Sequence, residues 1–570
     1  MKNLFLTAAL VGIMACNNAT PKQELNSLIE TYQEYQKEND TEHPLGDYRE
    51  AAFEKRASFC DSLLKKLRTI NPNSFDEDHE TSFKLLEFVL NEVVTKYKFK
   101  THWNPILSDA GFHSSLTYRV RPITSKKGAL SYLKKLKAIP LYIEQQTELI
   151  RKGLEAEMGQ PLVIFKGYES TYEQYITATA EENFYYSPFL NLPTPLSKEE
   201  KDSLQKAAKE VVLKQVIPSF QAVKTFFEED YYPNTRKSIG VSETPNGRAY
   251  YQSRINYYTT LNLSAEEIHQ KGITEIVRIK KQMEAIVQKV NFKGTLQEFI
   301  AFLRTDPQFY ANTPEELLKH ARNIAKKLDE QLPRYFKTLP RKPYGVAPVP
   351  DAIAPKYTGG RYVGTSPEST DPGYYWVNTH NLPSRPLYVI PSLTAHEAVP
   401  GHHLQGALNQ ELPKSIPQFR RNLYLSAYGE GWGLYTEFLA NEMGIYTTPY
   451  EHFGKLTYEM WRACRLVVDT GIHVFGWSRQ QAVDFMAENT ALSLHEVNTE
   501  VDRYISWPGQ ALSYKIGELK IRELRTLAEN ELSSEFDIRE FHEQILEKGT
   551  LTLPLLESRI LNYIKKNKSK

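Results

Sequence analysis

Cysteine is scarce in this sequence, with three in 570 residues, at positions 16, 60 and 464. A secreted domain that depends on disulfides carries many more, so the fold must depend on a hydrophobic core. Cys464 lies in an apolar stretch, which predicts a buried, inert thiol. Neither sign of charge is in excess. The formal net charge is +1, which excludes an overall electrostatic attraction to nucleic acid.

Long apolar runs are missing after the N-terminus, so we expect no membrane-spanning helix. The N-terminus itself has the layout of a secretory signal peptide: Lys2 precedes an apolar run at 4–14, and a small residue stands before Cys16. Residues 13–16 also resemble a bacterial lipobox, in which the cysteine becomes lipidated after cleavage. We therefore expect a signal peptide at 1–16 and a lipid on Cys16. The protein would be exported and held in the cell envelope by that lipid alone.

Helical patterns dominate the remaining chain. Ser264 and Glu267 form a capping-box pattern that predicts a helix of some 25 residues. Thr313 followed by Pro314 predicts another helix start. Prolines and glycines cluster between about 340 and 392, where two aromatic and β-branched segments predict short strands, at 373–378 and 386–390.

The predicted fold is therefore mainly α, with a small β-sheet directly before the motif described next. We expect an N-terminal helical region at 17–240 and a second helical region at 241–570 that carries the functional site. The two would form one continuous body with a cleft. An edge strand beside that site would hold an extended peptide backbone in line.

The most informative stretch is 394–405, Thr-Ala-His-Glu-Ala-Val-Pro-Gly-His-His-Leu-Gln. Zinc binds imidazole nitrogens and carboxylates, and a catalytic site keeps one position open for water. A general base must lie beside that water, and zinc peptidases place Glu directly after the first ligand histidine. His396 and Glu397 supply this pair. The second ligand usually follows four residues later, but that residue here is Pro400.

Two histidines, His402 and His403, are candidates for the second ligand. On a regular helix His403 returns to the face of His396, although about 10 Å further along the axis. A bulge at Pro400-Gly401 that absorbs two residues would instead bring His402 into position. Both possibilities stay open. A third interpretation makes Glu397 only the capping-box partner of Thr394 at a helix start.

An acidic third ligand is expected from 426–437, Ser-Ala-Tyr-Gly-Glu-Gly-Trp-Gly-Leu-Tyr-Thr-Glu. Each glycine inside a helix costs about 1 kcal/mol relative to alanine, a cost that is tolerable where another backbone approaches closely. Glu430, which lies among the glycines, is the predicted ligand. Glu437 lies seven residues later on the same face, where it would orient a ligand histidine or be a solvated acid.

The two motifs, His-Glu-Ala-x-Pro-Gly-His-His-x-Gln and Glu-Gly-Trp-x-Leu-Tyr-x-Glu, resemble those of a bacterial family of unknown function that contains many lipoproteins. That family is similar to zincin peptidases of the thimet oligopeptidase, carboxypeptidase Taq and angiotensin-converting enzyme type. The resemblance covers about Leu263 to Leu556. It implies a helical, zincin-like metallopeptidase body with one zinc ion and Glu397 as general base. The implied activity is zinc-dependent hydrolysis of short peptides outside the cytoplasm.

The segment 461–477 carries Arg462, Arg465, Asp469 and His473 on one helical face. They would form a ladder of ion pairs or a polar wall of the cleft. In the second case His473 would donate a hydrogen bond to the oxyanion of the tetrahedral intermediate.

Peptidases of the resembled type polarise the scissile carbonyl with a tyrosine from a late segment. On that resemblance Tyr504 is a catalytic candidate. Tyr514 and Lys515 would bind the terminal carboxylate of a substrate, and Gln510 its backbone. Asn378, in the predicted edge strand, is a further substrate-binding candidate. Each of these residues has an alternative as an ordinary packing or surface side chain.

Two other functions stay open. One is a helical surface lipoprotein that binds nutrients or partners, with a metal site that is either absent or structural, held by four protein ligands. The other is a zinc hydrolase of non-peptide amides or esters. The expected cofactor is zinc, and the expected partner is a peptide substrate.

Overall fold

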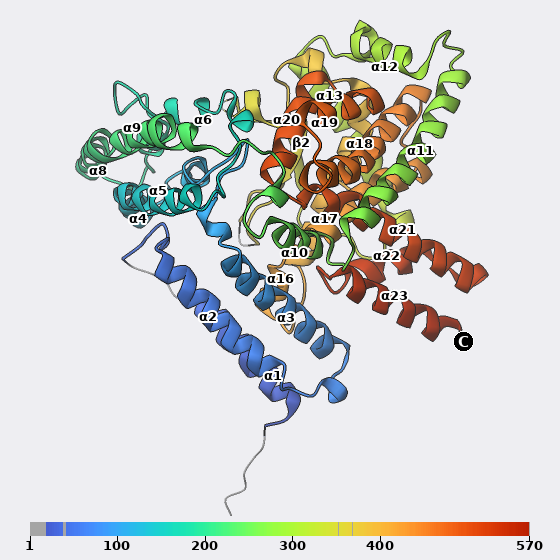
Figure 1. Cartoon of the computed structure of the whole chain (residues 1–570), viewed down its shortest axis with the longest axis horizontal. Coiled ribbons are helices and arrows are strands. Elements are labelled where there is room, and N and C mark those ends of the chain that lie inside the picture. The colour runs from blue at the N-terminus through green and yellow to red at the C-terminus, as the bar shows by residue number, and fades with distance from the viewer. Residues whose placement is uncertain (1–18, 38–41, 352, 368, 569–570) are drawn as a thin grey trace, which may run out of the picture.

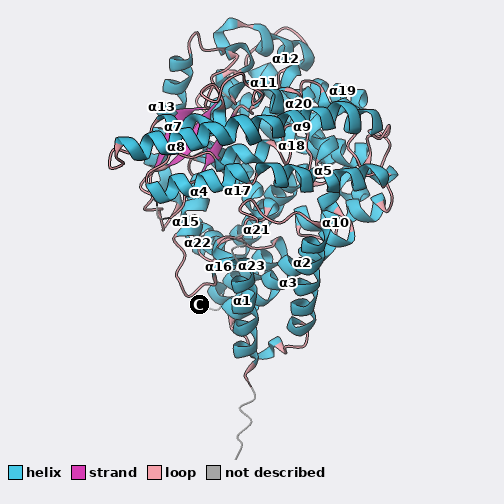
Figure 2. Ribbon diagram, turned by 90° about the vertical axis from the view of Figure 1, so that its left-hand side faces the viewer, coloured by secondary structure: helices cyan, strands magenta, loops and turns pink. Residues whose placement is uncertain are grey.

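The computed structural model describes residues 19–37, 42–351, 353–367 and 369–568 (Figure 1). The predicted signal peptide and Cys16 lie outside these residues, so the lipid anchor stays a prediction. Helices make up most of the described chain and the named strands form one small sheet, as the sequence predicts (Figure 2). No described helix has the length and apolar character that a membrane crossing requires.

The described α-helices before residue 240 fall into two groups (Figure 1). The first three pack on one another, and the next six lie above them in that view. The bounds are α1 Pro21–Lys37, α2 Glu50–Leu67, α3 Glu77–Lys98, α4 Lys126–Lys137, α5 Ile139–Glu155, α6 Ser170–Glu173, α7 Ser187–Leu190, α8 Lys198–Val211 and α9 Ile217–Thr225. A π-helical turn at Val212–Val216 joins α8 directly to α9.

Helix starts in the middle of the chain follow the predicted capping residues. α11 (Ala265–Lys289) begins after Ser264, which forms the reciprocal capping box with Glu267. α13 (Pro314–Tyr335) begins after Thr313, whose side chain accepts a hydrogen bond from the backbone of Glu316. These caps satisfy N–H groups that a helix start leaves without partners. The other two helices here are α10 Gly247–Thr259 and α12 Leu296–Thr305.

The sheet has the strand order β1-β3-β2, with β1 Tyr344–Pro348, β2 Gly360–Val363 and β3 Gly373–Val377. The central β3 pairs parallel with β1 and antiparallel with β2, so β2 is an edge strand. The strand predicted at 373–378 is confirmed as β3, but the prediction that it is an edge strand is wrong, because β3 is central and Asn378 lies directly after it. The strand predicted at 386–390 is wrong, because 387–389 form a 3₁₀ turn that leads into α14. Pro391, in the first turn of that helix, favours a helix start there.

Within the described part of the chain, ten α-helices follow the sheet, and three of them carry the residues of the candidate site. Their bounds are α14 Ile390–Glu397, α15 His402–Gln410, α16 Gln418–Arg421, α17 Ser426–Glu442, α18 Pro449–His473, α19 Arg479–Asn489, α20 Leu494–Ser506, α21 Ser513–Leu532, α22 Ile538–Leu546 and α23 Leu553–Lys568. α18 packs along α11, and α17 packs on both α14 and α21. Cys464, in α18, is buried and free as predicted.

One cluster of buried hydrophobic side chains runs through the molecule, from Leu25 in α1 to Ile564 in α23. Polar contacts join the same regions. The side-chain amide of Gln160 donates to the carbonyl of Ser506 at 2.9 Å, and Arg254 in α10 pairs with Glu92 in α3 at 2.7 Å. The helices before residue 240 and those after it therefore share one hydrophobic core.

Candidate metal centre

The predicted metal motif folds as two helices with a sharp turn between them. α14 ends at Glu397 and α15 begins at His402, so Pro400 and Gly401 lie in the turn. A side chain at Gly401 would lie 1.8 Å from the carbonyl oxygen of His396, so this position requires glycine. The interpretation of Glu397 as a helix-start cap is wrong, because Glu397 is the last residue of its helix.

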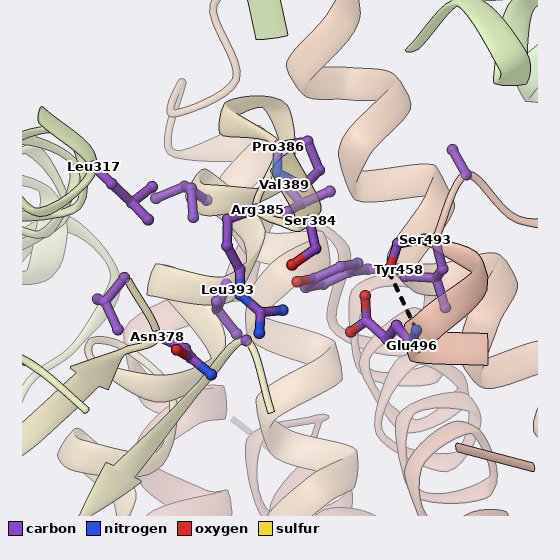
Figure 3. Close-up of a pocket in the computed structure, with 15 residues that line it drawn as sticks. Leu317, Asn378, Ser384, Arg385, Pro386, Val389, Leu393, Tyr458, Ser493 and Glu496 are labelled. Carbon is purple, nitrogen blue, oxygen red and sulfur yellow. Dashed lines mark hydrogen bonds between the residues drawn. The ribbon is translucent and has the colours of Figure 1, made fainter. Parts of the chain in front are cut away.

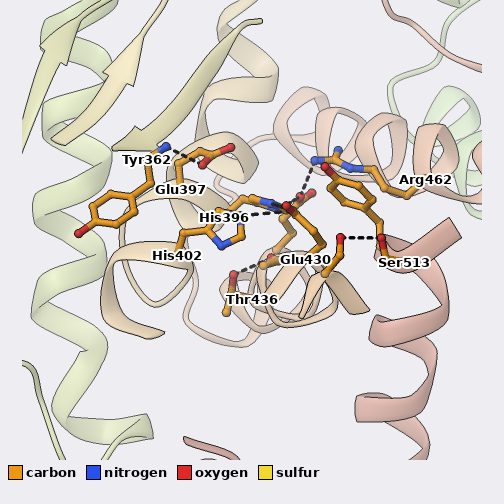
Figure 4. Close-up of polar contacts among 12 residues, drawn as sticks. Tyr362, His396, Glu397, His402, Glu430, Thr436, Arg462 and Ser513 are labelled. Atoms are coloured by element: carbon orange, nitrogen blue, oxygen red, sulfur yellow. Dashed lines mark hydrogen bonds and ion pairs between the residues drawn. The ribbon is translucent and has the colours of Figure 1, made fainter. Parts of the chain in front are cut away.

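The turn brings His396 and His402 to the same point (Figure 4). Their rings are 4.8 Å apart between centroids and nearly perpendicular. Oε2 of Glu430, in α17, lies 3.4 Å from Nε2 of His396 and 3.3 Å from Nε2 of His402. One ligand atom of each of these three residues lies within 4.8 Å of the other two. The three side chains thus form a group that can hold a metal ion.

Several residues of the motif in α17 contact α14 and the turn that follows it. Gly433 lets the His396 ring lie against the helix, since an added Cβ would lie 2.7 Å from it. The indole of Trp432 donates to the carbonyl of Pro400 at 2.9 Å. The hydroxyl of Thr436 donates to the carbonyl of Ala395 at 3.0 Å. α17 therefore fixes both the ring and the backbone that carry the first histidine.

Glu437 holds the other nitrogen of His396. Its Oε1 lies 2.8 Å from His396 Nδ1, and both side chains are buried. The guanidinium of Arg462, in α18, lies 3.2 Å from the same oxygen. A hydrogen bond on Nδ1 selects the tautomer of a metal-ligating histidine and orients its ring. Nε2 is accordingly the nitrogen left to face Glu430 and His402.

The side chain of Glu397, at the end of α14, is bound to the edge strand β2. Its Oε2 accepts a hydrogen bond from the backbone N–H of Tyr362 in β2 at 2.8 Å (Figure 4). The carboxylate therefore lies between the edge of the sheet and the metal-ligand group, on the residue that follows His396. A general base in a zinc hydrolase needs this neighbourhood.

Electrostatics at the group favour a cation. Burial would raise the pKa of Glu430, but the His402 and His396 imidazoles hold it well below its usual range. Burial would lower the pKa of His396, yet hydrogen bonds to Glu430 and Glu437 raise it to about 10. Carboxylates thus surround His396 and stabilise positive charge there.

The residues present fit zinc. Two imidazoles and one carboxylate are a donor set that zinc takes in catalytic sites. No fourth histidine, cysteine or acid joins the group within the described ranges. Three ligands leave one coordination position for solvent, whereas a closed structural site needs four.

His403 is not part of this group, which corrects its place among the predicted ligands. Its Nδ1 lies 3.1 Å from the hydroxyl of Tyr362, and its ring packs on Tyr344. Burial lowers the pKa of His403 to about 4. The reason is the turn: because α15 starts anew at His402, the rule of seven residues per two turns does not connect His396 to His403.

His473 cannot stabilise an oxyanion as predicted, because the backbone occupies both ring nitrogens. Nδ1 accepts from the N–H of Val241 at 3.1 Å, and Nε2 lies 2.9 Å from the carbonyl of Tyr504. The hydroxyl of Tyr504 accepts hydrogen bonds from Trp461 and Arg465, both at 2.9 Å, within a buried network. Tyr504 is thus a packing residue in this structure.

Lys515 is also corrected. It is completely buried and pairs with Glu275, Glu459 and Glu518 at 2.9 to 3.1 Å, so its ammonium is not available to a substrate. The predicted ladder on α18 does not form either. Arg465 pairs with Glu500 at 2.9 Å, and Asp469 accepts from Tyr251 at 2.5 Å. Each of these side chains binds a neighbouring helix or loop.

The remaining substrate-binding candidates have structural partners. The amide of Asn378 donates to three carbonyls of the loop at 354–358, although the residue lines a small cavity behind α14 (Figure 3). Gln510 accepts from Arg503 at 2.7 Å. The ring of Tyr514 lies under the guanidinium of Arg465, at 4.1 Å. Asn378 therefore orders the loop before β2.

Three contacts of the centre were not anticipated from the sequence. The hydroxyl of Tyr424 donates to Oε1 of Glu430 at 2.9 Å. The N–H of Tyr362 binds Glu397, and Arg462 binds Glu437. Tyr424 lies six residues before Glu430 and Arg462 lies on the polar helical face noted in the sequence, but neither position specifies its partner. The backbone N–H of Tyr362 could not be predicted as a partner, because every residue of a strand other than proline has such a group.

The model of a bacterial protein family of unknown function, DUF885, matches residues 30–560. The chain belongs to this family. The match extends over most of the N-terminal helices, beyond the resemblance at Leu263 to Leu556. No curated protein matches this DUF885 member in sequence.

Two solved bacterial structures have a fold similar to that of this chain. The chain is similar to the crystal structure of a predicted lipoprotein from Colwellia psychrerythraea, with a TM-score of 0.88 and 28% identity, covering 96% of this chain and 100% of that one. It is also similar to a predicted lipoprotein of unknown function from Shewanella oneidensis, with a TM-score of 0.66 and 18% identity, covering 95% and 100%. The second likeness shows the fold alone.

Proposed function

We propose that this DUF885 protein is a zinc-dependent hydrolase of peptide bonds. The observation that carries the proposal is the convergence of His396, His402 and Glu430 within 4.8 Å, with Glu397 next in sequence to the first ligand. A ligand set of this type, with a carboxylate beside it, matches the requirements of a zinc peptidase. We also propose that the DUF885 family is related to the zincin peptidases.

Each residue of the centre has a distinct task in this mechanism. His396, His402 and Glu430 would hold the zinc ion, which when bound supplies a polarised water and a Lewis acid for the substrate carbonyl. Glu397 takes the proton of the attacking water and passes it to the leaving nitrogen. Because Tyr362 binds Oε2 of Glu397, Oε1 is the atom that receives the proton. Glu437 and Arg462 keep the His396 ring in place.

The edge strand suggests an extended substrate. β2 has one strand neighbour, β3, and its Tyr362 N–H points away from it toward Glu397. A peptide backbone that adds to this edge would run past the general base. Short peptides are the proposed substrates, because a folded protein offers few extended segments to such an edge.

We also propose that the protein works outside the cytoplasm as a lipid-anchored protein. Support comes from the signal-like N-terminus with Cys16 and from the similarity to the predicted lipoprotein of Colwellia psychrerythraea.

Metal analysis and a single substitution test the proposal. The purified protein should contain one zinc ion per chain and cleave members of a quenched-fluorescent peptide library. Glu397→Gln should retain zinc and lose hydrolysis by about 100-fold or more, because it removes the general base. Glu488→Gln, at an exposed position of α19, is the matched control and should behave as wild type.

Other outcomes separate the alternatives. Turnover of ester or non-peptide amide probes, with none on peptides, would keep the zinc chemistry and change the substrate. Zinc without any turnover would favour a binding lipoprotein. Full activity of Glu397→Gln would refute the assigned base.

A further inference from the structure

Tyr424 stands beside the metal-ligand group without being part of it. It lies in the loop between α16 and α17, is 54% exposed, and donates its hydroxyl proton to Oε1 of Glu430 at 2.9 Å. The mechanism above gives it no role. Its position next to a ligand carboxylate requires a separate explanation.

The two oxygens of Glu430 have different surroundings. Oε2 faces both histidines, 3.4 Å from His396 Nε2 and 3.3 Å from His402 Nε2. Oε1 is bound by Tyr424. A carboxylate can ligate zinc through one oxygen or through both, and a second bound oxygen would fill the position needed by water. A hydrogen bond to Oε1 competes with that second bond.

We propose that Tyr424 is a positioning residue that restricts Glu430 to one-oxygen ligation through Oε2 and so keeps a coordination position open. The inference rests on the proposed function, since it concerns the same metal. It adds a cause for the open position, which the three ligand residues alone do not guarantee.

The surrounding structure holds Tyr424 in place. Gly429 permits the close approach of its ring to α17: an added Cβ would lie 2.4 Å from the ring and 2.7 Å from the hydroxyl. The loop is anchored on the other side by the buried Arg420, which donates to Ser82 at 3.1 Å and to the carbonyl of Lys548 at 3.1 Å. The close fit at Gly429 and the anchored start of the loop together direct the phenol at Glu430.

Cobalt substitution gives a readout that does not depend on turnover. The visible absorption of Co²⁺ weakens as its coordination number rises. In Tyr424→Phe the freed Oε1 should join the ion, so the visible band of the cobalt protein should lose intensity. kcat of the zinc form should fall about 10- to 100-fold, as for other groups that orient metal ligands. Gly429→Ala should weaken the band too, because it displaces the same hydroxyl.

Tyr428→Phe is the matched control. Its hydroxyl lies on the same helix but donates to the carbonyl of Ile545, away from the metal-ligand group, so the cobalt spectrum should not change. A wild-type spectrum in both Tyr424→Phe and Gly429→Ala would overturn the role of Tyr424 and leave the metal site intact. A wild-type protein that takes up neither zinc nor cobalt would overturn the proposed function instead.

Discussion

At the scale of single residues, Asp469 shows that a buried acid in this molecule need not have a cationic partner. It is fully buried in α18, and its oxygens accept from the hydroxyl of Tyr251 at 2.5 Å and the N–H of Gly509 at 3.1 Å. Burial raises its pKa to about 7 despite these hydrogen bonds. The folded protein therefore keeps a proton on Asp469 at pH values where the unfolded chain has released it.

This difference predicts a pH-dependent effect of Asp469→Asn. The unfolded carboxyl titrates near its ordinary value of about 3.9, so the folded state binds the extra proton between about pH 4 and 7. Asp469 thus makes wild type less stable as pH rises through that window. Asparagine does not titrate, so the stability of the variant relative to wild type should improve from pH 5 to pH 8, by at most about 1.4 kcal/mol per pH unit.

Urea unfolding at both pH values measures this change. Asp484→Asn, at an exposed position of α19, is the control for loss of one carboxylate. A variant whose stability difference from wild type stays the same at pH 5 and pH 8 would contradict the assignment.

The predicted site residues that the structure brings together differ in a physical respect from those that it places elsewhere. His396, Glu397 and Glu430 were identifiable because zinc chemistry requires these residue types in short motifs. Lys515 and His473 were misassigned because a buried polar side chain takes its partner from wherever the fold places one. Glu459 and Val241, their partners, lie far away in sequence.

At the scale of elements, α17 acts as the support of the first histidine. Gly433, Thr436 and Glu437 contact the ring or backbone of α14, and Gly431 lies against the backbone of Gly517 in α21. The sequence indicated that the glycines allow a close approach. It left the choice between His402 and His403 open, because that depends on the turn at 398–401.

Gly433→Ala is predicted to damage the centre through this contact. The new methyl group would lie 2.7 Å from the His396 ring, which must move. We expect a loss of about 1–3 kcal/mol in the free energy of unfolding, as for other overpacked interiors, together with weaker zinc binding. Chemical denaturation and competition with a chromophoric chelator measure the two effects.

Gly406→Ala provides the control for this substitution. Gly406 lies within α15, and the nearest atom to an added Cβ is 3.7 Å away, on Tyr362. Alanine there should leave zinc affinity unchanged and stabilise the helix by up to about 1 kcal/mol. Equal zinc affinity in the two variants would show that the Gly433 contact does not position the histidine.

At the scale of the whole molecule, the N-terminal helices and the region of the metal centre share one core and one buried ion pair. Arg254 in α10 forms two hydrogen bonds with Glu92 in α3, at 2.7 and 3.0 Å. Both side chains are buried. This pairing was not visible in the sequence, because the partners lie 162 residues apart. The helical character of both regions was predictable from periodicity and caps.

Removing one partner of this pair should destabilise the entire chain. Glu92→Leu leaves the Arg254 guanidinium buried without a counter-charge, which costs about 3–5 kcal/mol in comparable cases. Unfolding should remain a single transition when helix content and tryptophan fluorescence are compared. The double variant Glu92→Leu with Arg254→Met should recover much of the loss. A separate early transition of the N-terminal helices would contradict a shared core.

The contacts that join α16 to the N-terminal helices around Arg420 have a further consequence. Its neighbour Phe419 donates a backbone hydrogen bond to Gln33 in α1 at 3.0 Å, and Arg420 reaches Ser82 in α3. Three residues separate Arg420 from Tyr424, and Glu430 follows six residues after Tyr424. The first helices of the described chain thus support the loop that leads to the metal-ligand group, so their removal by a protease would disturb that group although they do not touch it.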